Sequence, residues 1–189
     1  MSAPASVTLR ASRLARALAW MGSTLQRVVP RALGPLFLIA WVGVIWYASS
    51  IQPPDIGHGE ASGAILSNLL HAPEFGVLTL CACLCLPRKD GWARTETWRL
   101  QTVFLAVLVY AIVDEAHQAF TPHRDPSVCD VLTDATAATC VLLAVRFAGG
   151  EHASTRKLER TIAWGLLACL LCACIATFVP ELRPEWGWL

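Results

Sequence analysis

Ionisable side chains gather in the segment from Asp114 to Asp134, which lies between two long apolar stretches. The segment holds five carboxylates, two histidines and one arginine. A charged side chain at the centre of a bilayer costs roughly 2.5–3.5 kcal/mol on insertion scales, so a group of them there indicates a functional site. Carboxylates and imidazoles at close range can act as acids and bases, accept hydrogen bonds from a ligand or hold a cation.

The composition indicates that membrane helices position these residues. Of the 189 residues, 55% are hydrophobic and 15% are charged, and the mean hydropathy is +0.50. Soluble domains carry about 25% charged residues. Five apolar stretches, each long enough to cross a core of about 30 Å as a helix, cover residues 33–51, 67–86, 100–120, 128–147 and 161–179. The sequence therefore predicts an all-α polytopic membrane bundle of about five transmembrane helices.

The distribution of Lys and Arg predicts the orientation of this bundle. Thirteen of the fifteen lie in the N-terminal tail or in the regions of the second–third and fourth–fifth connections. The other side carries only Arg124 and Arg183. Because basic loops stay in the cytoplasm, we expect a cytoplasmic N-terminus and a C-terminus outside.

Two alternative interpretations, a cleaved secretory signal and a role for the cysteines in disulfides or metal binding, are less favourable. A secretory signal cleaved near Ala48, Ser49 and Ser50 would need an apolar core of about 7–15 residues, and the first stretch is longer. The eight cysteines could form disulfides or bind metal, but they lie within apolar stretches or at their edge. We expect most of them to pack as small hydrophobic residues.

Positions along the stretches place polar groups at one depth. Asp114 lies about 21 Å from the cytoplasmic end of the third helix, at 1.5 Å per residue. Asp130 and Asp134 lie about 3 and 9 Å below the outer boundary of the fourth helix. His71 and Glu74 lie about 6 and 10 Å down the second helix. Three helices thus bring ionisable groups into the outer third of the membrane.

Residues three or four apart share a helix face, so these groups can point inward together. The candidates for catalysis are His71, Glu74, Asp114 and Glu115. The candidates for ligand binding are Asn68, Gln118, Arg124, Asp130 and Asp134. A guanidinium can grip an anionic group with two parallel hydrogen bonds, which is the role expected for Arg124. The negative charge requires an ion pair, a divalent cation or protonation. No metal and no cofactor is assigned from the sequence.

Two segments carry a resemblance to a known family. One is Asn68 to His71 with Phe75 and Gly76; the other is Asp114-Glu115 followed by Gln118, Phe120, Pro122, Arg124, Ser127, Asp130 to Leu132 and Ala137-Ala138. At these residues the chain resembles the VanZ-like family of small bacterial membrane proteins. It departs from the family pattern at His123, where the family usually has Gly, at Asp134, where Asn is common, and near Ala137, where Gly is common.

The apolar stretches, the charges and the resemblance together imply a domain organisation, and the resemblance implies a location. Residues 1–32 are expected to form a basic cytoplasmic tail and 33–147 a VanZ-like four-helix membrane core. A cytoplasmic loop follows at 148–160, and 161–189 add a fifth transmembrane helix with a short outer tail. The family is named for a member linked to teicoplanin resistance. It implies a multi-pass protein of the bacterial cytoplasmic (inner) membrane and a connection with antibiotic resistance.

Three functional hypotheses follow, and whether the protein is an enzyme stays open. In the first, an outward-facing polar pocket engages an envelope lipid or a glycopeptide-like amphiphile at the outer leaflet and modulates envelope or antibiotic susceptibility. In the second, the protein is an intramembrane hydrolase or transferase acting on a lipid-linked substrate. In the third, the polar residues form a packing network without chemistry. Membrane lipids are the expected partners, and nothing indicates nucleic-acid binding.

Overall fold

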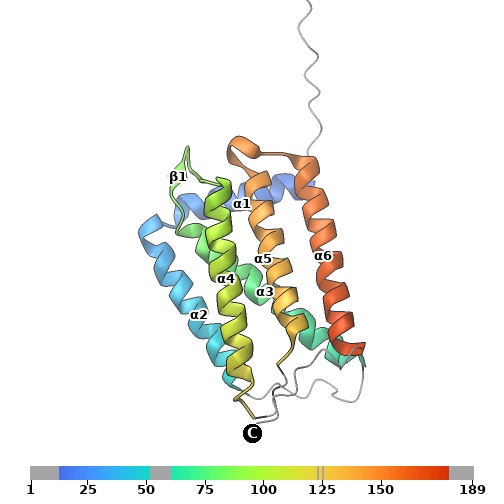
Figure 1. The fold of residues 1–189 in the computed structure, drawn as a ribbon. Helices are drawn as coiled ribbons and strands as arrows, with labels where there is room; N and C mark the ends of the chain where they lie inside the picture. The colour runs from blue at the N-terminus through green and yellow to red at the C-terminus, as the bar shows by residue number, and fades with distance from the viewer. Residues whose placement is uncertain (1–12, 52–60, 123, 125, 179–189) are drawn as a thin grey trace, which may run out of the picture.

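The computed structural model describes residues 13–51, 61–122, 124 and 126–178, and this part of the chain is built almost entirely of helices (Figure 1). The helices are α1 (Arg13–Val28), α2 (Gly34–Ser50), α3 (Ala61–Leu84), α4 (Thr97–Gln118), α5 (Val128–Ala148) and α6 (Thr155–Phe178). Two 3-10 turns, η1 (Arg31–Leu33) and η2 (Gly150–His152), lead into α2 and α6. The predicted all-α membrane bundle is confirmed.

Four of the five predicted spans have the length and hydropathy of a membrane-crossing helix, namely Arg31–Ser50, α4, α5 and α6. In α3 the described apolar part, Asn68–Leu84, is shorter. This helix also carries His71, Glu74 and an internal Pro73, and it crosses obliquely behind α4 and α5 (Figure 1). The direction in which the chain crosses the membrane stays a prediction.

Helices extend beyond the apolar stretches that predicted them. The third α-helix begins at Ala61 rather than Ser67, and α6 begins at Thr155 rather than Thr161. The added first turn of α6 carries Arg156 and Lys157, and both residue types favour helix. Apolarity therefore marks the part suited to lipid, whereas helical propensity carries the helix further into the polar flank.

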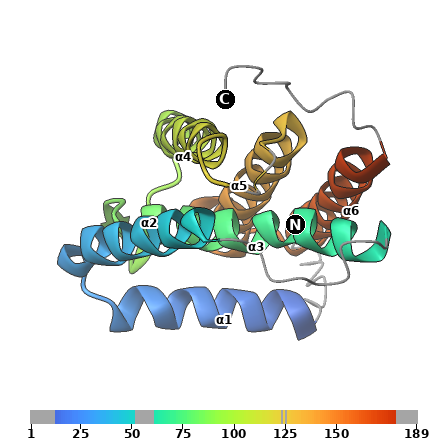
Figure 2. The same cartoon turned by 90° about the horizontal axis from the view of Figure 1, so that it is seen from below.

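The predicted basic tail contains a helix that lies across one end of the bundle. Figure 2 shows α1 from the side, whereas α4, α5 and α6 are seen closer to end-on. Trp20, Met21 and Val28 of α1 are exposed. The β1–β2 hairpin and the start of α6 lie at the same end as α1 (Figure 1), so the segments rich in Lys and Arg share one end of the molecule.

A two-residue hairpin connects α3 to α4. Strands β1 (Arg88–Lys89) and β2 (Trp92–Ala93) pair antiparallel. Between them Asp90 and Gly91 have φ values of 52° and 77°, as the type I′ turn of tight hairpins requires. The buried Trp92 donates its indole N–H to the carbonyl of Val145 at 3.1 Å. This bond fixes the hairpin against α5.

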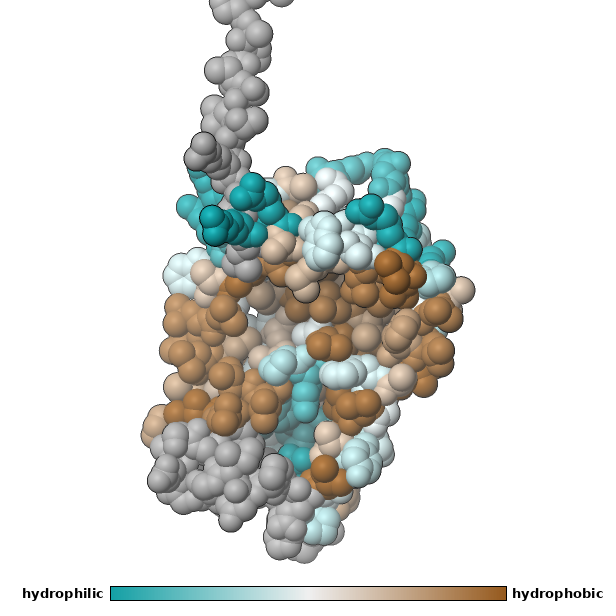
Figure 3. Space-filling view, turned by 180° about the vertical axis from the view of Figure 1, so that it is seen from behind, coloured by the Kyte–Doolittle hydropathy of each residue, from teal (hydrophilic) through white to brown (hydrophobic). Residues whose placement is uncertain are grey.

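The apolar core lies between α2, α3, α4 and α5, and the outer faces of the helices are also apolar. Ile45, Phe75 and Ala138 are completely buried at the centre of this core. Large hydrophobic side chains remain exposed on the outside, among them Leu105, Val109, Trp164, Leu171 and Phe178. Figure 3 shows a broad hydrophobic surface below a hydrophilic end. An apolar exterior of this kind suits contact with lipid.

Close packing of α5 against α6 predicts sensitivity at Gly165. A Cβ atom at Gly165 would lie 2.3 Å from Sγ and 2.8 Å from Cβ of Cys140. We expect Gly165→Ala to lower stability by about 1–3 kcal/mol, the usual cost of overpacking, with a lower midpoint of thermal unfolding in detergent micelles. Adding Cys140→Ala should restore part of the loss. Gly43→Ala is the control, because nothing lies within 4 Å of its added Cβ; equal effects at both glycines would contradict the prediction.

Candidate functional site

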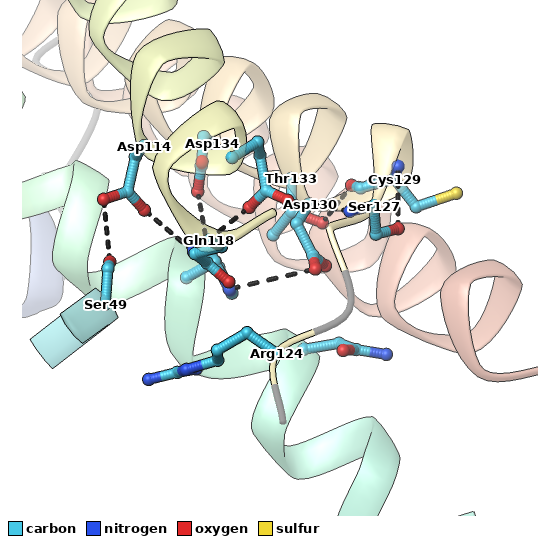
Figure 4. A network of polar contacts seen from close by, with 12 residues as sticks. Ser49, Asp114, Gln118, Arg124, Ser127, Cys129, Asp130, Thr133 and Asp134 are labelled. Carbon is cyan, nitrogen blue, oxygen red and sulfur yellow. Dashed lines mark hydrogen bonds and ion pairs between the residues drawn. The ribbon is translucent and has the colours of Figure 1, made fainter. Parts of the chain in front are cut away.

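Polar residues from α2, α3, α4 and α5 meet at the end of the bundle opposite α1. Figure 3 shows hydrophilic side chains in a narrow band between hydrophobic surfaces in the lower half of the molecule. Figure 4 shows Asp114, Asp130 and Asp134 converging on the region around Gln118. The predicted meeting of three helices is thus present, and α2 contributes as a fourth.

Asp114 is the centre of one half of this site. Its side chain is 1% exposed, and both carboxylate oxygens accept hydrogen bonds (Figure 4). Ser49 donates its hydroxyl to Oδ1 at 2.7 Å, and Gln118 donates its amide to Oδ2 at 2.9 Å. Asp114 therefore joins α4 to the C-terminal end of α2.

Glu115 connects α4 to the start of α5. Its Oε2 atom accepts the backbone N–H of Ser127 at 2.7 Å, and the residue is 6% exposed. Ser127 is also the N-cap of α5, because its hydroxyl oxygen accepts the N–H of Cys129 at 3.1 Å. The second carboxylate oxygen, Oε1, receives only a long contact from the amide of Gln118, at 3.4 Å.

His71 forms the other half of the site with two aspartates of α5. Its Nε2 atom lies 3.9 Å from Oδ2 of Asp130, and its Nδ1 atom lies 3.5 Å from Oδ1 of Asp134. Asp130 and Asp134 are 5% and 0% exposed. The spacing of four residues places both carboxylates on the inward face of α5, as the sequence predicted.

One of these groupings has the composition of a metal site. His71, Glu115 and Asp130 each offer a ligand atom, and the three atoms lie within 4.8 Å of one another. They come from α3, α4 and α5. Imidazole nitrogen and carboxylate oxygen are both ligands of Zn²⁺ in proteins.

Arg124 lies at the end of α2. It donates from Nη2 to the carbonyl of Ala48 at 2.6 Å and from Nε to the carbonyl of Ile51 at 3.2 Å. The last carbonyls of a helix lack partners within the helix and carry partial negative charge. Arg124 therefore caps α2, and its expected contact with an anionic ligand remains a prediction.

Two other predicted residues lie outside the central contacts. Asn68 donates its amide to the hydroxyl of Thr177 at 3.2 Å and so connects α3 to α6. Glu74 is half-buried, and its backbone carbonyl accepts the indole N–H of Trp41 at 2.9 Å. Neither residue belongs to the His71 grouping. His123 and Asp125 lie outside the described residues.

Sequence reasoning missed the hydroxyl and backbone groups that fix the carboxylates. Ser49 was considered only as part of a cleavage site, yet it is buried and bound to Asp114. Its position at the end of an apolar stretch, level with the carboxylates, is the signal that could have identified it. The neighbouring Ser50 hydroxyl lies 2.9 Å from Nε2 of His117, whose ring stacks on Trp46 at 3.9 Å.

Comparisons with known proteins give one match. A family model described as VanZ/LLP1 matches residues 35–149. The matched range includes α2 except for Gly34, all of α3, α4 and α5, and every residue of the polar site. No curated protein and no solved structure matches the chain.

The capping contacts of Arg124 predict a stability effect. Arg124→Ala removes both bonds to the end of α2, and hydrogen bonds to charged groups contribute about 1.5–3 kcal/mol. We expect a lower midpoint of thermal unfolding in detergent micelles. Arg124→Lys should recover only part of the lost stability, since a single ammonium group cannot donate to both carbonyls with the planar geometry of a guanidinium. The exposed Arg156 supplies the control Arg156→Ala. An unchanged midpoint for Arg124→Ala would show that the cap does not stabilise the fold.

Proposed function

The chain belongs to the VanZ/LLP1 family, and from that premise we propose that it is a multi-pass protein of the bacterial cytoplasmic membrane whose polar site binds an amphiphile. The proposed ligand is an envelope lipid or a glycopeptide-like molecule with an apolar chain. Binding would alter the susceptibility of the envelope to glycopeptide antibiotics, in line with the teicoplanin-resistance member for which the family is named.

The observation that carries this proposal is a buried, acceptor-rich site inside an apolar exterior. Carboxylates of Asp114, Glu115, Asp130 and Asp134 gather where the helices meet. Such groups accept hydrogen bonds from hydroxyl, amide or amine donors, and bonds to a charged partner are stronger than neutral ones. In a ligand with a donor-rich head and an apolar tail, the head would donate hydrogen bonds to these carboxylates and the tail would pack among the lipid chains.

The direction of entry follows from the charge distribution. The polar site lies at the end of the bundle opposite the Lys- and Arg-bearing segments of α1, the hairpin and the start of α6. If those basic segments face the cytoplasm, as the positive-inside tendency predicts, the site faces the outer leaflet. A ligand of the outer leaflet would then reach it without crossing the membrane.

The alternative function is an intramembrane hydrolase or transferase acting on a lipid-linked substrate. His71 between Asp130 and Asp134 favours it, because a carboxylate beside an imidazole supports general acid–base catalysis. Glu115 would be a second acid or base. A third possibility is that the site only braces the helices, for which the bonds of Asp114 to Ser49 and Gln118 are the supporting observation.

Ligand binding can be tested with the full chain in lipid nanodiscs. Teicoplanin is the probe, and the same molecule without its acyl chain tests the need for an apolar tail. We expect Asp114→Asn and Glu115→Gln each to weaken teicoplanin binding by at least about tenfold, or about 1.4 kcal/mol, because each replaces a buried carboxylate with an amide. The exposed Glu151 at the opposite end provides the matched control Glu151→Gln.

The outcomes separate the three functions. Weaker binding with an unchanged midpoint of unfolding supports the binding site. Equal loss of binding and of folded protein in both site variants supports a bracing network. Release of a product from a lipid-linked substrate, lost in His71→Ala, supports an enzyme. If teicoplanin and its deacylated form bind wild type and both site variants alike, the proposed amphiphile site is wrong.

A further inference from the structure

Three helices bring one metal-ligand atom each to the same place. The donors belong to His71 of α3, Glu115 of α4 and Asp130 of α5, and they lie within 4.8 Å of one another. Ligand bonds of about 2.0–2.2 Å place two donors of one Zn²⁺ ion at most about 4.4 Å apart. The observed spacing is close to that limit, so side-chain rotation without movement of the helices would bring the donors into coordination.

The contacts of His71 and Glu115 leave one possible ligand atom on each side chain. His71 directs Nε2 toward Asp130, at 3.9 Å from Oδ2. Glu115 is fixed through Oε2 by the backbone N–H of Ser127. This leaves Oε1, whose contact with Gln118 is long at 3.4 Å. The carboxylate is therefore held in place by one oxygen while the other remains able to bind a cation.

Asp134 provides an independent observation. The residue is 0% exposed, and within the described part of the chain neither of its carboxylate oxygens has a hydrogen-bond partner. Oδ1 lies 3.5 Å from Nδ1 of His71. Metal-binding histidines usually donate their second ring N–H to a carboxylate, which fixes the tautomer and the ring orientation. Asp134 stands in that position if Nε2 of His71 binds the ion.

The charge of the region also calls for a cation. Glu115, Asp130 and Asp134 are three carboxylates in a small buried volume, and His71 lies 3.9 and 3.5 Å from the two aspartates. Three acids thus gather around one imidazole, and like charges buried together are expensive. Arg124 directs its Nε and Nη2 donors to the carbonyls at the end of α2. Bound between the helices, a divalent ion would offset two of the three negative charges.

The donor types select the class of ion. Mg²⁺ and Ca²⁺ prefer oxygen ligands alone, whereas imidazole suits Zn²⁺ and other transition-metal ions. We infer that His71, Glu115 and Asp130 form a site for a divalent transition-metal ion, with Zn²⁺ as the leading candidate, and that Asp134 orients His71. Three protein ligands leave a position for the oxygen of water or of a bound molecule. This site goes beyond the proposed amphiphile binding and does not depend on it.

Metal titration of the full chain tests the inference. The protein is purified in detergent without a histidine tag, treated with a chelator and titrated with Zn²⁺ against a chromophoric competitor. We expect one ion per chain, and loss of that binding in Glu115→Gln and in Asp130→Asn. Asp134→Asn should weaken binding by about 10- to 100-fold, the usual effect of changing a residue that orients a metal ligand. Glu151→Gln should bind as wild type does.

Thiols are the competing ligands and are tested with Co²⁺. The described cysteines are all free thiols, and thiolate ligation gives Co²⁺ an intense sulfur-to-metal charge-transfer band. The proposed site predicts that wild type lacks this band and that Cys172→Ser binds normally. A strong band, no bound ion, or unchanged affinity in both carboxylate variants would overturn the proposal. If those variants fail to fold, the wild-type Co²⁺ spectrum and the Asp134→Asn affinity still decide it.

Discussion

The cost of burying carboxylates is the constraint on which the structure of this bundle depends. Asp114, Glu115, Asp130 and Asp134 are all nearly inaccessible in a molecule whose exterior is apolar. An ionised carboxylate without partners is far more expensive in such surroundings than any single helix contact can offset. The helices must therefore meet where Ser49, Gln118, Ser127 and His71 can face these groups. The apolar core can therefore adopt only those packing arrangements that keep these polar contacts.

Backbone carbonyls at helix ends are a second set of polar groups that need partners, and arginine side chains supply them. Arg124 donates to carbonyls at the end of α2, Arg88 to those of Gln26 and Val29 near the end of α1, and Arg31 to that of Cys85 after α3. Unpaired C-terminal carbonyls and the helix dipole both favour a cation there. Arginines that indicate orientation in the sequence thus also join helices that are distant along the chain.

Apolar stretches, charges and spacing were sufficient to predict the long helices from α2 to α6 and the meeting of polar residues from three of them, whereas α1 lies in the segment expected to be a tail. The pairing of Asp130 with Asp134 follows from four-residue spacing, and the common depth of His71 and Asp114 follows from helical rise. The partners did not follow from these patterns. Whether Ser49 faces Asp114 depends on how α2 rotates about its axis, which hydropathy does not determine. The start of α6 at Thr155 likewise reflects helical propensity within a charged segment.

The two halves of the site differ in a way that bears on function. Both oxygens of Asp114 already accept hydrogen bonds from the protein, so this half is satisfied without a ligand. Around His71, Asp134 is fully buried; its Oδ1 forms an ion pair with Nδ1 of His71 at 3.5 Å, whereas its Oδ2 accepts no hydrogen bond from the described residues. A network built only to brace helices would be expected to satisfy its most buried acceptors, because an unsatisfied one costs about 1–3 kcal/mol. This difference argues that the half around His71 is arranged for an additional bound group. The half around Asp114 would then hold the half around His71 in position.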